Sequence, residues 1–237
     1  MDFAAEFLAE NQAFSDLVLS APQDTPVPSC PGWTLKQLLH HIGRGHRWVA
    51  QIIVEGTDVD PATVAHGKPP EDLDAARQWL LDGGRLLVDT AADAADTQAW
   101  TFVGPQPVSW WLRRRLHETL VHRADAAIAV GTEFVVAPAL AADALSEWLD
   151  IVFGLGRGTG DRSLHLHATD DGLGAAGEWT IAHGAWTHAH GKGDVALRGP
   201  ATDLLLAVTG RRDIADTAVE LFGDDAVWRT WLDNAKF

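Results

Sequence analysis

Apolar residues recur at helical spacing through most of the first 153 residues. This periodicity predicts helices over residues 2–20, from Thr34 to about Val54, and over 71–96, 110–130 and 138–153. Gln37 stands three residues after Thr34, which is the spacing of a capping box at the start of the second helix. Ser109 is the predicted cap of the fourth helix, and Gly131 is its predicted C-terminal stop.

The pattern changes after a glycine-rich segment at residues 154–160, where we place the domain boundary. Leu164, Leu166 and Ala168 then alternate with polar residues, which indicates a half-buried strand. Similar alternation follows at 178–181 and 185–189, and helical spacing returns at 200–208 and 213–222. The predicted fold class is α+β, with a helical bundle at residues 1–155 and a small α/β domain at 161–237.

Gly172, Gly174 and Gly177 match the G-x-G-x-x-G pattern of dinucleotide-binding loops. That loop requires a helix to follow, so that the helix N-terminus holds the pyrophosphate. Residues 178–181 alternate like a strand instead. The motif therefore predicts a hairpin turn.

Composition narrows the classes of partner. The formal charge of −15 disfavours nucleic acid and anionic membranes, and no apolar run approaches the ~18 residues of a membrane helix. The first residues show no secretory signal, and the single Cys30 excludes an internal disulfide. We expect a cytoplasmic monomer or weak homo-oligomer whose partners are small molecules.

Eleven histidines beside one cysteine mean that any transition-metal site here must use imidazole and carboxylate. Glu118 and His122 are four residues apart on the fourth helix, so they share a face and supply two of the three protein ligands of an open zinc site. His117 is about 140° from His122 at ~100° per residue and cannot join them. From the spacing alone, a surface Glu–His pair is the favoured interpretation. A zinc hydrolase is disfavoured, because the H-E-x-x-H motif is absent.

A third ligand must come from another helix, and the second helix offers His40, His41 and His46. His46 lies within the apolar stripe, His41 on its flank and His40 on the far side. Periodicity does not choose between His41 and His46, and a core histidine is the alternative for either.

Three further features leave alternatives open. Asp125, three residues after His122, either orients it or is an ordinary surface acid. His165 and His167, like His188 and His190, share a strand face. Solvent-facing positions on a one-sided sheet explain these pairs most simply, whereas adjacent strands would bring them together as a second metal site.

Three segments carry a resemblance to a known family: residues 29–43 around His41, residues 115–125 around Glu118, and residues 195–211. Together they resemble the mycothiol-dependent maleylpyruvate isomerase family. That family belongs to the DinB-like four-helix metalloproteins and carries a C-terminal, sterol-carrier-protein-like domain. The segments occur in the same order, so the resemblance spans nearly the whole chain.

The resemblance implies that His41, Glu118 and His122 bind one zinc or another divalent metal, and that Arg211, beside Arg212, is the functional arginine. It implies mycothiol as the thiol cofactor or co-substrate, activated as a thiolate for attack on a small electrophile. The sequence does not separate an isomerase from an S-transferase. The alternatives are thiol exchange in natural-product biosynthesis and a non-enzymatic metal- or small-molecule-binding protein on the same fold.

Overall fold

The computed structural model describes residues 1–158 and 160–235. The chain forms two compact units, Met1–Phe134 and Val135–Phe237. The first unit is helical and the second combines helices with a sheet, so the predicted fold class is confirmed.

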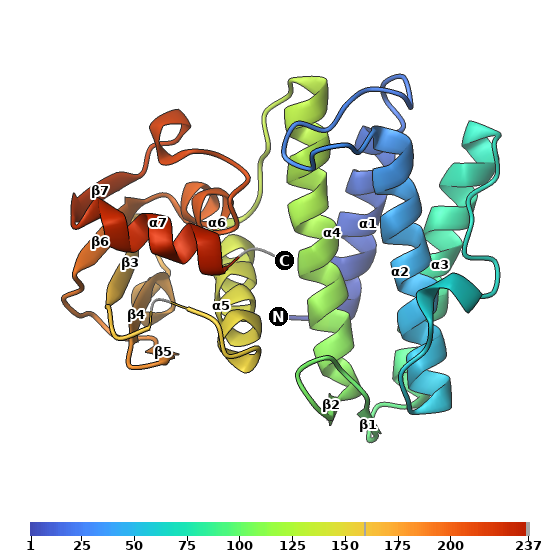
Figure 1. Ribbon diagram of the computed structural model, residues 1–237. Helices are drawn as coiled ribbons and strands as arrows, with labels where there is room; N and C mark the ends of the chain where they lie inside the picture. The colour runs from blue at the N-terminus through green and yellow to red at the C-terminus, as the bar shows by residue number, and fades with distance from the viewer. Residues whose placement is uncertain (159, 236–237) are drawn as a thin grey trace. The chain divides into compact units, whose positions relative to one another are not determined.

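The first unit is a four-helix bundle (Figure 1). Its long helices are α1 Phe3–Val18, α2 Leu35–Glu55, α3 Leu73–Asp93 and α4 Val108–Val130. A short 3₁₀ helix η1 (Pro61–Thr63) precedes α3, and the two-residue strands β1 (Gln98–Ala99) and β2 (Gln106–Pro107) pair before α4. Within the bundle, α2 packs against both α3 and α4, while α1 packs against the same two helices from the other side.

Helices α2 and α4 begin in different ways. Gln37 Oε1 accepts a hydrogen bond from the Thr34 backbone N–H at 2.7 Å, as the capping-box spacing predicted. The expected Ser109 cap is wrong: α4 begins at Val108 with Pro107 as its N-cap. Pro107 lacks an N–H and has a φ of −55°, so it ends β2 and starts the helix directly. Gly131 ends α4 with a left-handed φ of 74°, as predicted.

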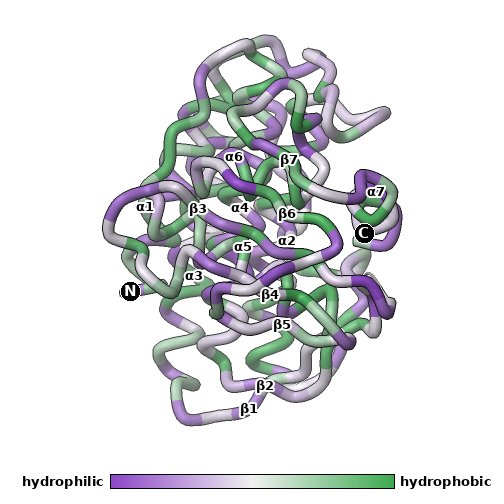
Figure 2. Tube along the Cα trace, turned by 90° about the vertical axis from the view of Figure 1, so that its left-hand side faces the viewer, coloured by the Kyte–Doolittle hydropathy of each residue, from purple (hydrophilic) through white to green (hydrophobic). Residues whose placement is uncertain are grey.

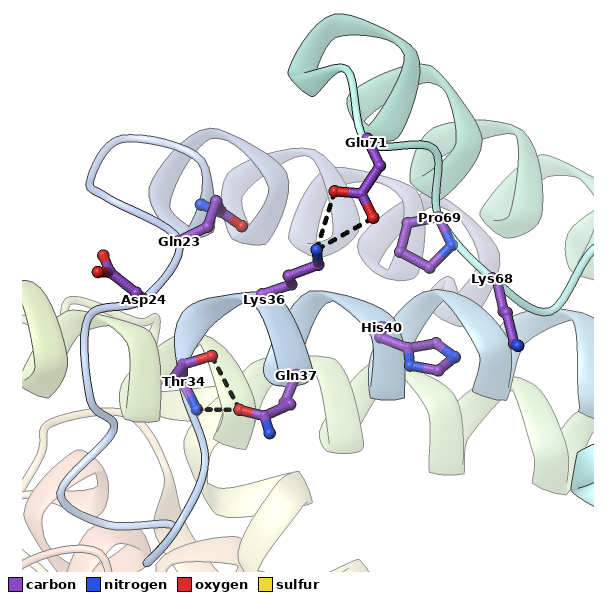
Figure 3. Close-up of a pocket in the computed structure, with 9 residues that line it drawn as sticks. All are labelled: Gln23, Asp24, Thr34, Lys36, Gln37, His40, Lys68, Pro69 and Glu71. Carbon is purple, nitrogen blue, oxygen red and sulfur yellow. Dashed lines mark hydrogen bonds and ion pairs between the residues drawn. The ribbon is translucent and has the colours of Figure 1, made fainter.

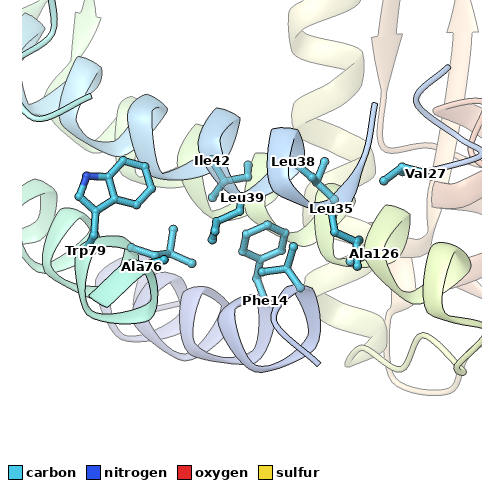
Figure 4. Packing of buried hydrophobic residues seen from close by; sticks show 11 residues of the cluster. Phe14, Val27, Leu35, Leu38, Leu39, Ile42, Ala76, Trp79 and Ala126 are labelled. Atoms are coloured by element: carbon cyan, nitrogen blue, oxygen red, sulfur yellow. The ribbon is translucent and has the colours of Figure 1, made fainter. Parts of the chain in front are cut away.

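The bundle core comes from all four helices (Figure 4). Phe14, Leu38, Ile42 and Leu80 are fully buried within it. Trp79 of α3 lies directly over Gly43 of α2, where a Cβ atom would stand only 2.1 Å from the indole. This close packing of α2 on α3 helps to fix the rotation of α2 about its axis.

Green and purple segments interleave along the trace in Figure 2, as expected for amphipathic elements around a core. Among the described residues, no helix has the length and apolarity needed to cross a bilayer.

The second unit contains helices α5, α6 and α7 and a five-stranded sheet of order β5-β4-β3-β6-β7. Its helices are α5 Pro138–Gly154, α6 Ala201–Val208 and α7 Asp225–Asn234, with 3₁₀ turns η2 Gly174–Gly177 and η3 Ile214–Asp216. Its strands are β3 Leu164–Ala168, β4 Glu178–Ala182, β5 Ala185–Thr187, β6 Val195–Gly199 and β7 Glu220–Gly223. Only the β3–β6 pair is parallel among these strands.

The glycine motif at 172–177 is a connection between antiparallel strands, which confirms the predicted hairpin. The helical prediction for residues 213–222 is wrong, because η3 and then β7 occupy that segment. Leu221 of β7 pairs with Leu197 of β6, so the sheet overrides the local helical spacing.

The structure also differs from the predicted boundary at residue 155, because the division falls before α5, at Phe134. α5 packs on α6 and η2, so its apolar residues belong to the core of the second unit. The structure also differs from the sequence prediction at His165. This residue was expected to face solvent, but its side chain is only 7% exposed.

Candidate metal centre

Two helices bring three potential ligands together in the bundle. His41 extends from α2 toward Glu118 and His122, which stand one turn apart on α4. His41 Nε2 lies 3.0 Å from Glu118 Oε1, and His122 Nε2 lies 3.4 Å from the same oxygen. One potential ligand atom from each residue lies within 4.8 Å of the others. We call these three residues the bundle site.

The spacing of the bundle site suits a tetrahedral ion. Ligands about 2.0–2.1 Å from a tetrahedral zinc are separated from one another by about 3.3 Å. The separations of 3.0 and 3.4 Å between Glu118 Oε1 and the two imidazole nitrogens lie close to that value. The side chains of His41 and Glu118 are 31% and 18% exposed, so the site is partly accessible to solvent.

Asp125 contacts Nδ1 of His122, the ring nitrogen that is not directed at Glu118. Its carboxylate is fully buried, and His122 Nδ1 lies 2.7 Å from Asp125 Oδ2. This contact directs the other ring nitrogen, Nε2, toward Glu118, as carboxylates do for metal-binding histidines. Of the two interpretations of Asp125, the structure therefore excludes the surface acid.

Cys30 lies in the same neighbourhood, with its sulfur 3.4 Å from Asp125 Oδ2. Cys30, His122 and Asp125 thus form a second conceivable ligand group that shares His122. An ion bound by this group would have to replace the 2.7 Å hydrogen bond between His122 Nδ1 and Asp125, whereas an ion at the bundle site would use His122 Nε2 and leave that hydrogen bond intact. The bundle site therefore fits an ion better than this group does.

Two further residues complete the surroundings, and sequence analysis assigned neither of them. Arg114 forms an ion pair with the second oxygen of Glu118, from one turn earlier on α4. Trp33 packs against both imidazoles, with its ring centroid 5.1 Å from that of His41 and 6.2 Å from that of His122. The i, i+4 spacing of Arg114 and Glu118 was a usable signal, whereas nothing in the spacing identified Trp33.

The environment keeps His41 neutral. Burial is the main cause that lowers its pKa from 6.5 to about 2, and positive charge on His122 and Arg115 acts in the same direction. A neutral imidazole has the lone pair that a metal ligand requires.

The other histidines that the sequence offered as metal ligands lie away from the bundle site. His46 is fully buried, contacts Asn11 Oδ1 at 3.0 Å and packs edge-on against Phe7, so it is a core residue. His40 Nε2 contacts the carbonyl of Gly67 at 2.9 Å, away from the bundle site. His117 is buried on another face of α4. The structure thus selects His41 as the partner of Glu118.

A surface pocket of about 760 Å³ also borders α2 (Figure 3). Its lining includes His40 and the Lys36–Glu71 ion pair of 2.9 Å, but no residue of the bundle site. This pocket is therefore distinct from the bundle site.

Arg211 belongs to the second unit, just after α6. Gly210 turns the chain there with a φ of 69°, and Arg211 Nη1 donates to the Thr209 carbonyl at 2.9 Å. Its role in the reaction stays a prediction.

Comparisons with known proteins agree with this architecture. Residues 5–127 match the family model for the mycothiol maleylpyruvate isomerase N-terminal domain, and residues 139–230 match the model for the C-terminal domain of the same family. No curated protein matches the chain.

Two solved structures share the fold. One is the mycothiol-dependent maleylpyruvate isomerase, with 17% identity and a TM-score of 0.65 over 93% of this chain and 91% of that one. The other is a histidine-to-alanine mutant of a mycothiol-dependent maleylpyruvate isomerase, with 16% identity and the same TM-score and coverage. The two family models together cover most of the sequence, and the chain belongs to the mycothiol-dependent maleylpyruvate isomerase family.

Proposed function

We propose that this protein is a metal-dependent enzyme that activates mycothiol for attack on a small electrophile. The observation that carries the proposal is the convergence of His41, Glu118 and His122 at separations that suit a tetrahedral ion. Membership of a family named for a mycothiol-dependent reaction supports mycothiol as the thiol.

A zinc-class divalent ion at the bundle site would hold a coordinated thiol as its thiolate at neutral pH. Two imidazoles and one carboxylate leave a coordination position open, and the exposed sides of His41 and Glu118 give access to it. The protein then needs no cysteine nucleophile of its own.

The chain's residues have distinct tasks in this proposal. Asp125 accepts a hydrogen bond from the Nδ1–H of His122, which would leave the Nε2 lone pair of His122 free to bind the ion. Arg114 holds one oxygen of Glu118 and leaves Oε1 facing both histidines. Trp33 covers the two imidazoles and shields that side from water.

The electrophile is the less determined part of the proposal. In an isomerase such as the family's name describes, Arg211 would hold a substrate carboxylate and stabilise negative charge that develops on the substrate. An S-transferase would need only the thiol transfer. Both reactions begin from the same activated thiol, so one experiment examines them together.

The test incubates zinc-loaded protein and mycothiol with either of two electrophiles. Formation of fumarylpyruvate is followed with maleylpyruvate, because an isomerase regenerates the thiol, and loss of free mycothiol is followed with a bimane electrophile. We expect zinc-dependent turnover of at least one electrophile, with fumarylpyruvate as the product if the protein is an isomerase. Protein stripped with a chelator is the control and should be inactive until zinc is restored. Turnover of neither compound would favour a non-enzymatic binding protein.

Arg211→Ala is expected to lower kcat/KM by about 10–100-fold while the bound metal stays unchanged. A charge-assisted hydrogen bond to a carboxylate is worth about 1.5–3 kcal/mol, and each 1.4 kcal/mol corresponds to tenfold. Steady-state kinetics and elemental analysis measure the two quantities. Arg212→Ala is the matched control. If Arg212→Ala shows the larger loss, the role belongs to Arg212, and unchanged kinetics in both variants would remove this segment from the reaction.

A further inference from the structure

The second unit contains its own cluster of histidines around one carboxylate. His165 and His167 project from the same face of β3, and the register pairs His167 with Glu178 on the neighbouring strand β4. β3, β4 and β5 lie side by side in the sheet (Figure 1). The opposite face of these strands carries the fully buried Leu164, Leu166 and Trp179. The cluster therefore lies on the face of the sheet away from its apolar core.

A third histidine reaches this face from the segment that follows β5. His190 Nδ1 lies 3.3 Å from Glu178 Oε1 and 3.4 Å from Oε2. His165 Nε2 lies 2.7 Å from Glu178 Oε2, and His167 Nδ1 lies 2.7 Å from Oε1. Three imidazoles thus surround the carboxylate of Glu178.

The segment that carries His190 is held closely against the sheet. Thr180 Oγ1 donates to the Ala189 carbonyl at 2.7 Å, and His188 Nδ1 lies 3.0 Å from the Glu178 carbonyl. A Cβ at Gly191 would stand 2.4 Å from Thr180 Oγ1, and one at Gly193 would stand 2.9 Å from the His165 backbone nitrogen. Glycine at both positions is what allows the chain to pass this near the sheet.

Burial distinguishes this cluster from an ordinary surface His–Glu pair. The side chains of His165 and Glu178 are only 7% and 16% exposed, although they lie on the outer face of the sheet, while that of His190 is 78% exposed. A polar cluster with a buried base and an exposed rim allows an ion to enter from solvent. One potential ligand atom from each of His165, Glu178 and His190 lies within 4.8 Å of the others.

We propose that His165, Glu178 and His190, the sheet site, bind a second divalent transition-metal ion of the zinc class. Imidazole and carboxylate are the ligands that zinc accepts where thiolate is absent, and the His190–Glu178 separations match the ligand spacing of about 3.3 Å in a tetrahedral zinc site. The 2.7 Å contact between His165 and Glu178 has hydrogen-bond length and would lengthen by about 0.6 Å when the ion is bound. His167 contacts Glu178 from outside the ligand set and orients its carboxylate. The ion links β3, β4 and the segment after β5.

The test reconstitutes the full chain with Zn²⁺ after chelator treatment, removes excess metal by gel filtration and counts the bound ions by elemental analysis. We expect His190→Ala, and separately Glu178→Gln, to retain one zinc ion fewer per chain than their parent. His183→Asn, in the exposed β4–β5 turn, is the matched control and should keep the parent's zinc content. Asn is chosen there because residue 183 has a φ of 53°.

The same variants made in a His122→Ala background separate the two sites. There, Zn²⁺ should still raise the melting temperature, and adding His190→Ala should abolish that rise. If His190→Ala and Glu178→Gln leave both the zinc content and the melting shift unchanged, the cluster is a hydrogen-bonded network and the proposal is overturned. If instead His122→Ala loses no zinc while His190→Ala does, the sheet site stands and the bundle site fails.

Discussion

Replacing His122 by alanine is expected to lower the zinc affinity of the bundle site by more than about 100-fold and to abolish zinc-dependent thiol turnover. Loss of a residue that merely orients a ligand costs about 10–100-fold in affinity, and loss of the ligand itself must exceed that. His122 also contacts Asp125, so in the proposed site alanine would remove both the ligand and the hydrogen bond that orients it. Competition with a chromophoric chelator measures the affinity, and formation of fumarylpyruvate or of the mycothiol–bimane conjugate measures turnover.

Two companion variants make this result specific. His40→Ala alters the residue next to His41 on the same helix, but His40 contacts Gly67 and should leave affinity and turnover unchanged. Glu118→Gln keeps the size of the side chain, removes its charge and should weaken zinc binding as well. Circular dichroism checks that each variant folds. A folded His122→Ala protein with parental zinc affinity and turnover would exclude the bundle site.

Much of the bundle site was predictable because α4 is a regular helix. Glu118 and His122 stand one turn apart, so their common face follows from helical geometry alone. The choice between His41 and His46 did not follow, because both lie near the apolar stripe of α2. The rotation of α2 decides it, and packing such as that of Trp79 on Gly43 helps to set this rotation. The choice of ligand on α2 therefore depends on a residue of α3, which the spacing of residues within α2 does not contain.

Asp125 shows why the surroundings of the site were harder to predict. A helix with one buried face displays acids on its other face, and that rule places Asp125 at the surface. α4 breaks the rule, because it buries polar and apolar residues around most of its circumference, including Arg115, His117 and Asp125. Buried polar residues in such a helix are recognised only by the partners they contact.

The second unit was predictable where its pattern is local. Alternation identified β3, β4 and β5, and the glycine motif gave the hairpin. β7 and the burial of His165 depend on pairing with distant segments, which periodicity does not contain. The boundary differs for a similar reason, since the apolar residues of α5 suit a bundle and a sheet core equally well.

Asp125→Asn is expected to lower the zinc affinity of the bundle site by about 10–100-fold while the protein still folds. Asparagine preserves the shape and still accepts a hydrogen bond from His122 Nδ1, but it lacks the negative charge that makes the imidazole a stronger ligand. Zinc titration against a chelator measures the change, and turnover at saturating zinc should recover most of the parental rate.

The matched control for Asp125→Asn is Cys30→Ala, because Cys30 contacts the same carboxylate at 3.4 Å. An ion at the bundle site needs no sulfur ligand, so Cys30→Ala should keep the parental zinc affinity. Replacement of zinc by Co²⁺ adds a spectroscopic criterion, since a cobalt–thiolate bond produces a charge-transfer band that imidazole and carboxylate ligands do not. If that band appears and disappears with Cys30→Ala, the ion lies between Cys30, His122 and Asp125. Its absence, together with weaker binding by Asp125→Asn, would place Asp125 behind His122 and the ion on the Glu118 side of the imidazole ring.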